Sequence, residues 1–233
     1  CTECCHFARS FQPPGATKPI MNASLLTRRQ FSVATGAAVV AGFHPAQAQE
    51  ERIVLGQSAA FTGPAAQLGI QFHAGAKLYF DLLNAQGGVG RRTIEIRQLD
   101  DGYEPERCAA NTKKLIDEDV FALFGYIGTP TSVVALPLAN RARMPFFAPF
   151  TGAMALRDPL SRTAFHVRAS YNDETALIVR QLTNLGLKKI AVFYQNDAYG
   201  KAGLDGVTLA LAAQNLKPAA LATVERNSVE VAA

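Results

Sequence analysis

Hydroxyl-bearing residues follow a predicted strand at residues 125–132 and could bind an anion. Thr129 is placed to cap the helix that begins here, and Pro130 to be its first residue, as is common at helix starts. Free backbone N–H groups at a helix start attract a carboxylate, and the three hydroxyls of this loop add donors. The hydroxyls could serve as caps alone, but capping needs only one of them. We therefore expect Thr129 to contact a ligand.

A second loop, residues 148–153, offers the same kind of chemistry after the next predicted strand. Thr151 supplies a hydroxyl, Gly152 lets a ligand approach the backbone, and Phe150 presents an apolar face. The alternative is an ordinary turn in which Phe150 belongs to the core.

Residues 196–200 form a third loop of this kind, after a strand later in the chain. Asp197 is suited to cap the helix that follows, and Tyr199 falls in the first turn of that helix. The Tyr199 ring could reach across a cleft and stack on a ligand while its hydroxyl makes a hydrogen bond. The alternative is a tyrosine that stays on the surface.

The other side chains that could do chemistry are expected to have structural roles rather than catalytic ones. Asp100 and Asp101 end a predicted strand and could bind a metal, but no histidine is near in sequence, which favours loop and cap roles. His73 and His166 are isolated, and Cys108 on a predicted helix is more typical of a small core residue than of a nucleophile. The sequence has no Gly-x-Ser-x-Gly, Walker or His-Glu-x-x-His motif. We assign no catalytic residue, no metal site and no cofactor.

Strands and helices alternate along the chain from residue 52 onward. Apolar runs bounded by turn residues predict strands at 52–58, 93–99, 120–125, 144–148, 164–168, 189–194 and 218–223. Helical spacing predicts helices at 66–86, 105–117, 130–142, 171–186 and 198–215. In the first of these helices the residues placed on or near one face are Ile70, Ala74, Leu78, Phe80 and Leu82. Such alternation is typical of a doubly wound α/β fold with parallel sheets, whose ligands bind beyond the carboxyl ends of the strands.

Arg28 and Arg29 precede a weakly apolar stretch and indicate an export signal. The stretch, residues 33–43, leads to small residues at 46–48 that suit signal cleavage. The paired arginines resemble those of twin-arginine signals, whose cargo crosses the membrane already folded. We therefore predict a twin-arginine-type signal peptide at residues 21–48 and a periplasmic location.

The net charge of the chain after the predicted signal limits the kinds of partner that it could bind. Four of the 23 Lys and Arg and one of the 19 Asp and Glu precede Gln49, so the remainder has a net charge of +1. Near-neutrality argues against nucleic acid as a partner.

Residues 1–20, with their cysteines Cys1, Cys4 and Cys5, are interpreted as upstream, non-native sequence. Asn227 and the residues after it are typical of a first helical turn, so we expect an incomplete reading frame.

Five stretches of the chain together resemble the periplasmic solute-binding proteins of branched-chain amino-acid ABC transporters. They are residues 58–66, 83–89, 125–132, 148–153 and 195–200. The sharpest features are the Asn-x-x-Gly-Gly-Val turn that begins at Asn84 and the Tyr-Gly pair at Tyr199. The resemblance implies a type I periplasmic binding fold with two doubly wound parallel-sheet lobes joined by hinge strands. It places the first lobe at residues 49–168 and the beginning of an incomplete second lobe at residues 169–233.

The same resemblance implies which residues would hold a solute. The family's solute contacts fall on Leu68, Thr129, Phe150, Thr151, Gly152 and Tyr199. Among these, Thr129, Thr151 and the helix-start amides would hold the carboxylate, while Leu68 and Phe150 would pack the side chain. Tyr199 would close from the second lobe. The acidic group that would hold the solute's amine would lie beyond residue 233.

Two departures from the family's pattern affect the choice of solute. Leucine-binding members carry small residues where Phe150 stands, and a first-lobe disulfide where this chain has Tyr103 and Gly128. Both departures argue against assigning leucine, isoleucine or valine.

We expect a monomeric, exported solute-binding protein, not an enzyme, that captures a small carboxylate-bearing solute and delivers it to an ABC permease. An amino acid is the first candidate for that solute. The main alternative is a ligand-sensing receptor module of the same fold. A third, an exported enzyme, would need a nucleophile and base or a metal cluster.

Overall fold

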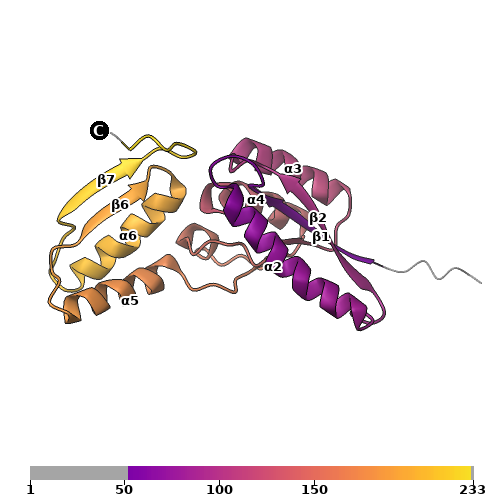
Figure 1. Cartoon of the computed structure of the whole chain (residues 1–233), viewed down its shortest axis with the longest axis horizontal. Helices are drawn as coiled ribbons and strands as arrows, with labels where there is room; N and C mark the ends of the chain where they lie inside the picture. The colour runs from indigo at the N-terminus through magenta and orange to yellow at the C-terminus, as the bar shows by residue number, and fades with distance from the viewer. Residues whose placement is uncertain (1–51, 232–233) are drawn as a thin grey trace, which may run out of the picture. The chain divides into compact units, whose positions relative to one another are not determined.

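The computed structural model describes residues 52–231, which form two parallel sheets with helices packed against them (Figure 1). The predicted signal peptide at residues 21–48 and the interpretation of residues 1–20 as upstream sequence lie outside the described residues. None of the helices in the described part of the chain is long and apolar enough to cross a membrane.

The first sheet has five parallel strands in the order β2-β1-β3-β4-β5. The strands are β1 Arg52–Ala59, β2 Thr93–Asp100, β3 Ala122–Phe124, β4 Phe146–Phe147 and β5 Ala164–Phe165. The last three are shorter than the sequence predicts, because only two residue pairs join each neighbouring pair of strands from β3 to β5. The doubly wound parallel arrangement that the sequence predicts is confirmed.

The position of β1 determines which face of the sheet each helix covers. The helices of this region are α2 Ala66–Ala85, α3 Pro105–Asp117 and α4 Thr129–Ala142. Because β1 lies between β2 and β3, the direction of the crossovers reverses there, and right-handed crossovers place α2 on one face and α3 and α4 on the other. The carboxyl ends of β1 and β3 therefore meet at a topological switch point, which is where open α/β sheets bind ligands.

Helix α2 begins where the sequence predicts and ends one residue early, but the side that it buries matches the predicted face only in part. Of the residues placed on one face, Leu78 and Leu82 are 74% and 57% exposed. Gly69 is on the buried side instead, where the helix lies close to Ala60. Only glycine fits there, because a Cβ at position 69 would lie 2.0 Å from the Ala60 carbonyl oxygen. Phe80, which the sequence does place on the predicted face, lies on this buried side and packs against the Phe124 ring of β3 at 5.6 Å between centroids.

The second sheet consists of β6 Ala191–Gln195 and β7 Ala220–Val224, which pair in parallel, with α5 Tyr171–Asn184 and α6 Ala198–Ala212 packed against each other. A capping box of Ser170 and Asp173 begins α5. The predicted helix start at Asn227 is wrong for the described residues, which show a turn and then irregular backbone up to residue 231. Asn227 has a φ of +56°, and its side chain bonds to Gly102 and Glu104 instead of capping a helix.

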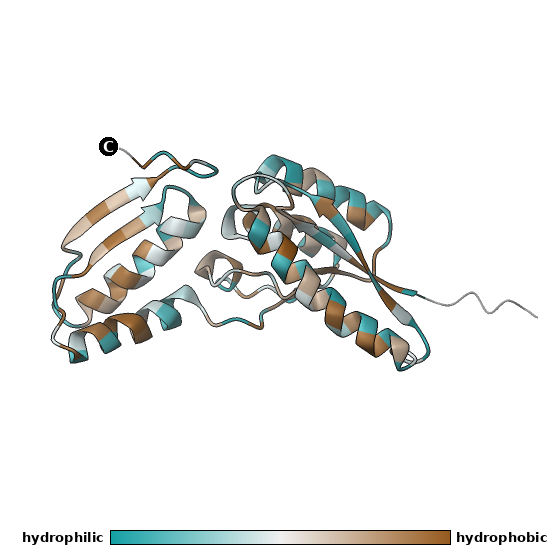
Figure 2. Ribbon diagram, in the orientation of Figure 1, coloured by the Kyte–Doolittle hydropathy of each residue, from teal (hydrophilic) through white to brown (hydrophobic). Residues whose placement is uncertain are grey.

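The main hydrophobic core lies mostly between the first sheet and helices α3 and α4. Figure 2 shows apolar stretches, in brown, on strands of both sheets. The buried members of the core are Cys108, Leu115, Val120, Leu123, Tyr126, Ala135, Leu136, Ala139, Met144, Phe146, Ala153, Leu156 and Tyr171. This core lies beneath the loops that follow β3 and β4, and so gives them a rigid base.

Candidate ligand-binding site

The start of α4 pairs a hydroxyl with a neighbouring loop instead of using it as a cap. Gly128, with a φ of +94°, is the N-cap, and Thr129 is the first helical residue, so the helix begins one residue earlier than the sequence predicts. Glycine suits the cap position because a positive φ is strained for other residues. The Thr129 hydroxyl lies 2.6 Å from the Thr151 hydroxyl. The prediction that Thr129 is the N-cap, and the capping alternative for its hydroxyl, are therefore wrong.

Two further hydroxyls lie in the first turn of α4. The Thr131 hydroxyl donates to the carbonyl oxygens of Ile127 and Gly128, so it serves local structure. The Ser132 hydroxyl is buried and has no hydrogen-bond partner among the described residues. The first intrahelical bond runs from the Ser132 N–H to the Gly128 oxygen at 3.2 Å. The N–H groups that precede it point beyond the helix end, where they suit an anion.

The loop after β4 lies beside the start of α4 and carries Thr151 and Gly152. The Phe150 N–H donates to the Tyr126 carbonyl at 2.7 Å, which joins this loop to the one after β3. Thr151 is fully buried. The Gly152 carbonyl accepts the Tyr171 N–H at 2.7 Å, and a Cβ on Gly152 would lie 2.7 Å from the Tyr171 ring. Gly152 therefore permits a close approach, and in this structure the approaching group is the start of α5.

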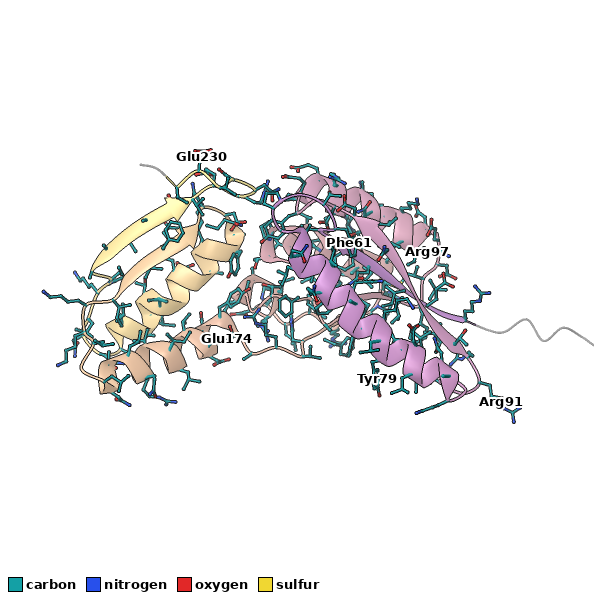
Figure 3. All side chains as sticks on the ribbon, viewed as in Figure 1. Phe61, Tyr79, Arg91, Arg97, Glu174 and Glu230 are labelled. Atoms are coloured by element: carbon teal, nitrogen blue, oxygen red, sulfur yellow. The ribbon has the colours of Figure 1, made fainter. Side chains whose placement is uncertain are left out.

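Arg168 links the Phe150 ring to the start of α5. Its guanidinium lies 5.1 Å from the centroid of the Phe150 ring and 5.2 Å from that of Tyr171. Two hydrogen bonds of 2.7 and 2.8 Å join it to Glu174 on α5. Glu174 is labelled in Figure 3. The Phe150 ring also packs against the Phe72 ring of α2, with 5.5 Å between the ring centroids. Phe150 therefore takes part in the packing of α2 as well.

Tyr199 stands in the first turn of α6, as the sequence predicts. Asp197 caps this helix and accepts the N–H groups of Tyr199 and Gly200 at 2.9 and 3.1 Å, so its predicted capping role is confirmed. The Tyr199 ring is 44% exposed and meets the Tyr171 ring edge-on at 5.7 Å. The two rings, together with Arg168, line a cavity of about 300 Å³.

The predicted site residues thus fall into three groups. Thr129 and Thr151 are in direct contact, and Gly152 lies next to them in the same loop. Phe150 precedes Thr151 in this loop, and Tyr199 is connected to Phe150 through Tyr171 and Arg168. Leu68 stands apart, 46% exposed in the first turn of α2.

Gly102 and Glu104, which the sequence pattern does not single out, contact the loop that follows β7. The Glu104 carboxylate accepts Arg226 Nη2 at 2.8 Å and Asn227 Nδ2 at 2.6 Å. Asn227 also donates to the Gly102 carbonyl oxygen at 3.1 Å. Tyr103, between Gly102 and Glu104, is only 7% exposed. Their position in the sequence could have indicated these residues, because residues 102–104 lie just after the end of a strand. Arg168 also lies shortly after a strand, β5.

Asp100 and Asp101 hold loops in place, as the sequence predicts. Asp100 accepts the Thr62 hydroxyl at 2.6 Å and Arg107 Nη2 at 2.8 Å. Burial acts to raise the pKa of Asp100, but the hydrogen bonds outweigh burial and hold the pKa well below its ordinary value. Asp101 is fully buried and accepts the Ser58 hydroxyl at 2.7 Å, and burial raises its pKa.

The remaining titratable candidates also have structural partners. His73 Nδ1 lies 2.8 Å from the Gln57 side-chain oxygen, and His166 Nε2 lies 3.1 Å from a backbone carbonyl. Cys108 is a buried core residue, as predicted, and burial raises the pKa of its thiol. Within residues 52–231, no three His, Cys, Asp or Glu side chains gather into a group that could hold a metal ion.

Residues 52–232 match the family described as "Periplasmic binding protein". The Leu/Ile/Val-binding protein homolog 7 of Brucella melitensis is 29% identical over 175 residues, which cover 70% of this chain and 43% of that protein. The chain spans half or less of the length of the curated relatives that it matches.

Two solved structures of related proteins share the fold. A possible leucine/isoleucine/valine-binding protein from Rhodopirellula baltica has 38% identity and a TM-score of 0.75, over 78% of this chain and 50% of that one. An extracellular ligand-binding receptor from Verminephrobacter eiseniae has 29% identity and a TM-score of 0.66, over 75% of this chain and 50% of that one. The neighbours therefore include proteins described as binding proteins and as a receptor.

Proposed function

The chain belongs to the periplasmic binding protein family, and from that premise we propose that it is an exported protein that captures a small carboxylate-bearing solute and delivers it to an ABC permease. An amino acid is the first candidate for the solute. The Brucella relative, described as a Leu/Ile/Val-binding protein homolog, and the Rhodopirellula structure, described as a possible leucine/isoleucine/valine-binding protein, support this choice. We assign the chain no catalytic role and no nucleic-acid partner, and we expect a monomer.

The observation that carries the proposal is the contact between Thr129 and Thr151 at the start of α4. Both side chains are buried, and they lie at the carboxyl ends of β3 and β4, next to the topological switch point. A carboxylate accepts hydrogen bonds only, so two hydroxyl donors and helix-start N–H groups complement it. The Thr129–Thr151 hydrogen bond would then be exchanged for bonds to the solute.

Capture is proposed to require closure of two lobes. In this scheme Phe150 and Leu68 pack the apolar part of the solute, and Tyr199 closes over it from the second lobe, which begins near residue 169. Closure is a hinge motion that a solute favours by contacting the closed form more extensively than the open one. The Arg168 bridge between Phe150 and Tyr171 lies where such a hinge would act.

Export is proposed to use the Arg28–Arg29 pair as a twin-arginine signal. The support is the order of paired arginines, weakly apolar stretch and small residues in residues 21–48. A ligand-sensing receptor of the same fold is the second candidate, favoured by the Verminephrobacter neighbour that is described as a receptor.

The proposal is tested by thermal unfolding of the native gene product with separate additions of L-leucine, L-valine, L-phenylalanine, propionamide and benzoate. A solute at about 100 times its Kd stabilises the folded state by about 2.7 kcal/mol, which gives a clear rise in Tm. We expect such a rise with the amino acids or another carboxylate. No rise with any of the five would contradict the proposal, and binding without solute uptake through a co-expressed permease would favour the receptor.

A further inference from the structure

Tyr103 occupies a backbone conformation that a bulky residue rarely adopts. Its φ is +66°, and that of the preceding Gly102 is +57°. A positive φ is strained for any residue with a Cβ, and such strain persists only where the surroundings enforce it. Here two carboxylates enforce it, because Asp100 accepts the Gly102 N–H at 3.0 Å and Asp101 accepts the Tyr103 N–H at 2.9 Å.

The Tyr103 ring lies directly against the start of α4. A Cβ added to Gly128 would fall 2.1 Å from Cε2 of the ring and 3.0 Å from its hydroxyl oxygen. Gly128 immediately precedes Thr129, so the phenol stands beside the helix start that is proposed to hold the carboxylate. Any residue other than glycine at position 128 would displace the ring.

Polar groups at the starts of α5 and α6 influence the phenol of Tyr103. Burial and then the negative charge of Asp197 raise the pKa of the Tyr103 phenol, a hydrogen bond with the Gln195 side chain acts to lower it, and Tyr171 and Tyr199 act in the same direction as Asp197. The hydrogen bond from Arg226 to Glu104, the residue after Tyr103, brings the loop after β7 to this place. Tyr103 is therefore enclosed between the loops of the two sheets, with 7% of its surface exposed.

We propose that Tyr103 is a specificity-determining residue of the solute site, with its ring as a wall beside the start of α4 and its hydroxyl as a hydrogen-bond partner of the solute. This inference rests on the proposed function. A phenol hydroxyl held in a fixed position rewards a solute with a matching polar group, and a fixed ring excludes bulky substituents on that side. The site then selects small, compact carboxylates.

The test measures the affinities of the native gene product for L-leucine, L-phenylalanine and benzoate by titration calorimetry. Tyr103→Phe removes only the hydroxyl, and we expect it to weaken the best-bound probe about tenfold or more. Tyr103→Ala removes the wall, and we expect it to shift the ratio of the L-phenylalanine and L-leucine affinities toward the larger probe by about tenfold. Tyr79→Phe and Tyr79→Ala are matched controls on the exposed side of α2 (Figure 3), and should change neither quantity.

Each contrary result has a distinct meaning. If both Tyr103 variants keep wild-type affinities, or weaken all probes equally without changing their ratio, the inference is overturned while the proposed function stands. Because Tyr103→Ala could disturb the strained turn, Tyr103→Phe, which keeps the ring, provides the independent reading. If the wild-type protein binds none of the probes, the proposed function fails and the inference fails with it.

Discussion

The two sheets of the chain differ in how deeply their side chains are buried. In the first sheet, Leu123 and Phe146 are fully buried within one continuous core. In the second, Phe193 of β6 is 63% exposed and Leu221 of β7 is 54% exposed. Regions with few buried apolar contacts open more easily than cores do. Among residues 52–231, the candidate carboxylate site thus stands on the more deeply buried sheet, and Tyr199 belongs to the region whose sheet is more exposed.

The largest effect that tests this comparison is the loss of one phenylalanine from each sheet. Phe146→Ala leaves a cavity beneath the ring of Tyr126, which it meets at 5.0 Å, and should lower the free energy of unfolding by about 3–5 kcal/mol. Phe193→Ala is the matched variant in the second sheet and should cost about 0.5 kcal/mol or less. Urea unfolding monitored by circular dichroism measures both values. Equal costs would show that the two sheets are equally well packed.

A smaller effect concerns the buried Asp101 carboxyl in the first region. Its pKa is raised above the ordinary value of 3.8, so the folded protein binds this proton more tightly than the unfolded chain does. The associated stability is fully present below 3.8 and is lost as the pH rises through the folded pKa. Asp101→Asn is neutral at every pH, so its stability relative to wild type should improve as the pH is raised from acidic to neutral values.

Urea unfolding at a series of pH values measures this trend. The matched control is Asp205→Asn, which changes an exposed aspartate on α6 and should show no such trend. A constant difference between wild type and Asp101→Asn across the pH series would mean that the folded state does not hold the Asp101 proton.

The smallest effect concerns the ion pair that joins the two regions. Glu104 and Arg226 are 37% and 28% exposed, so solvent weakens their attraction. Glu104→Gln should lower solute affinity by about two- to fivefold, and added salt should shrink the difference from wild type. Titration calorimetry at low and high salt measures this. Asp81→Asn, which breaks the exposed Lys77 pair on α2, is the control, and an equal loss there would remove any special role for Glu104.

Much of the fold could be predicted from the sequence because the pattern of each element is local. Apolar runs and their turn residues predict every strand of the two sheets, and Asp197 is recognisable as a cap from its place before an apolar helix. The buried side of α2 could not be predicted in this way. Leu78 and Leu82 have the spacing of a buried face, but the close approach of Gly69 to Ala60 sets the buried side of the helix, which leaves these two leucines exposed.

The candidate site was predictable only where position along a strand suffices. The rule that ligands bind at the carboxyl ends of strands leads to Thr129 and Thr151, which the structure brings together. The surroundings of the Tyr103 ring depend on residues far away in sequence, such as Gly128, and the contact of Arg168 with Phe150 joins two different loops, so no local pattern reports these contacts. Tertiary packing therefore determines the part of the site that the sequence pattern leaves open.

The most direct test of the central claim is the affinity of Thr129→Val for the probe that the wild-type native gene product binds best. Valine keeps the shape of threonine but removes the hydroxyl, and a hydrogen bond to a charged group contributes about 1.5–3 kcal/mol. The account predicts affinity about 10- to 100-fold weaker by titration calorimetry, whereas Thr183→Val, whose hydroxyl bonds only within α5, keeps wild-type affinity. Wild-type affinity in Thr129→Val would contradict the claim that the start of α4 holds the solute carboxylate.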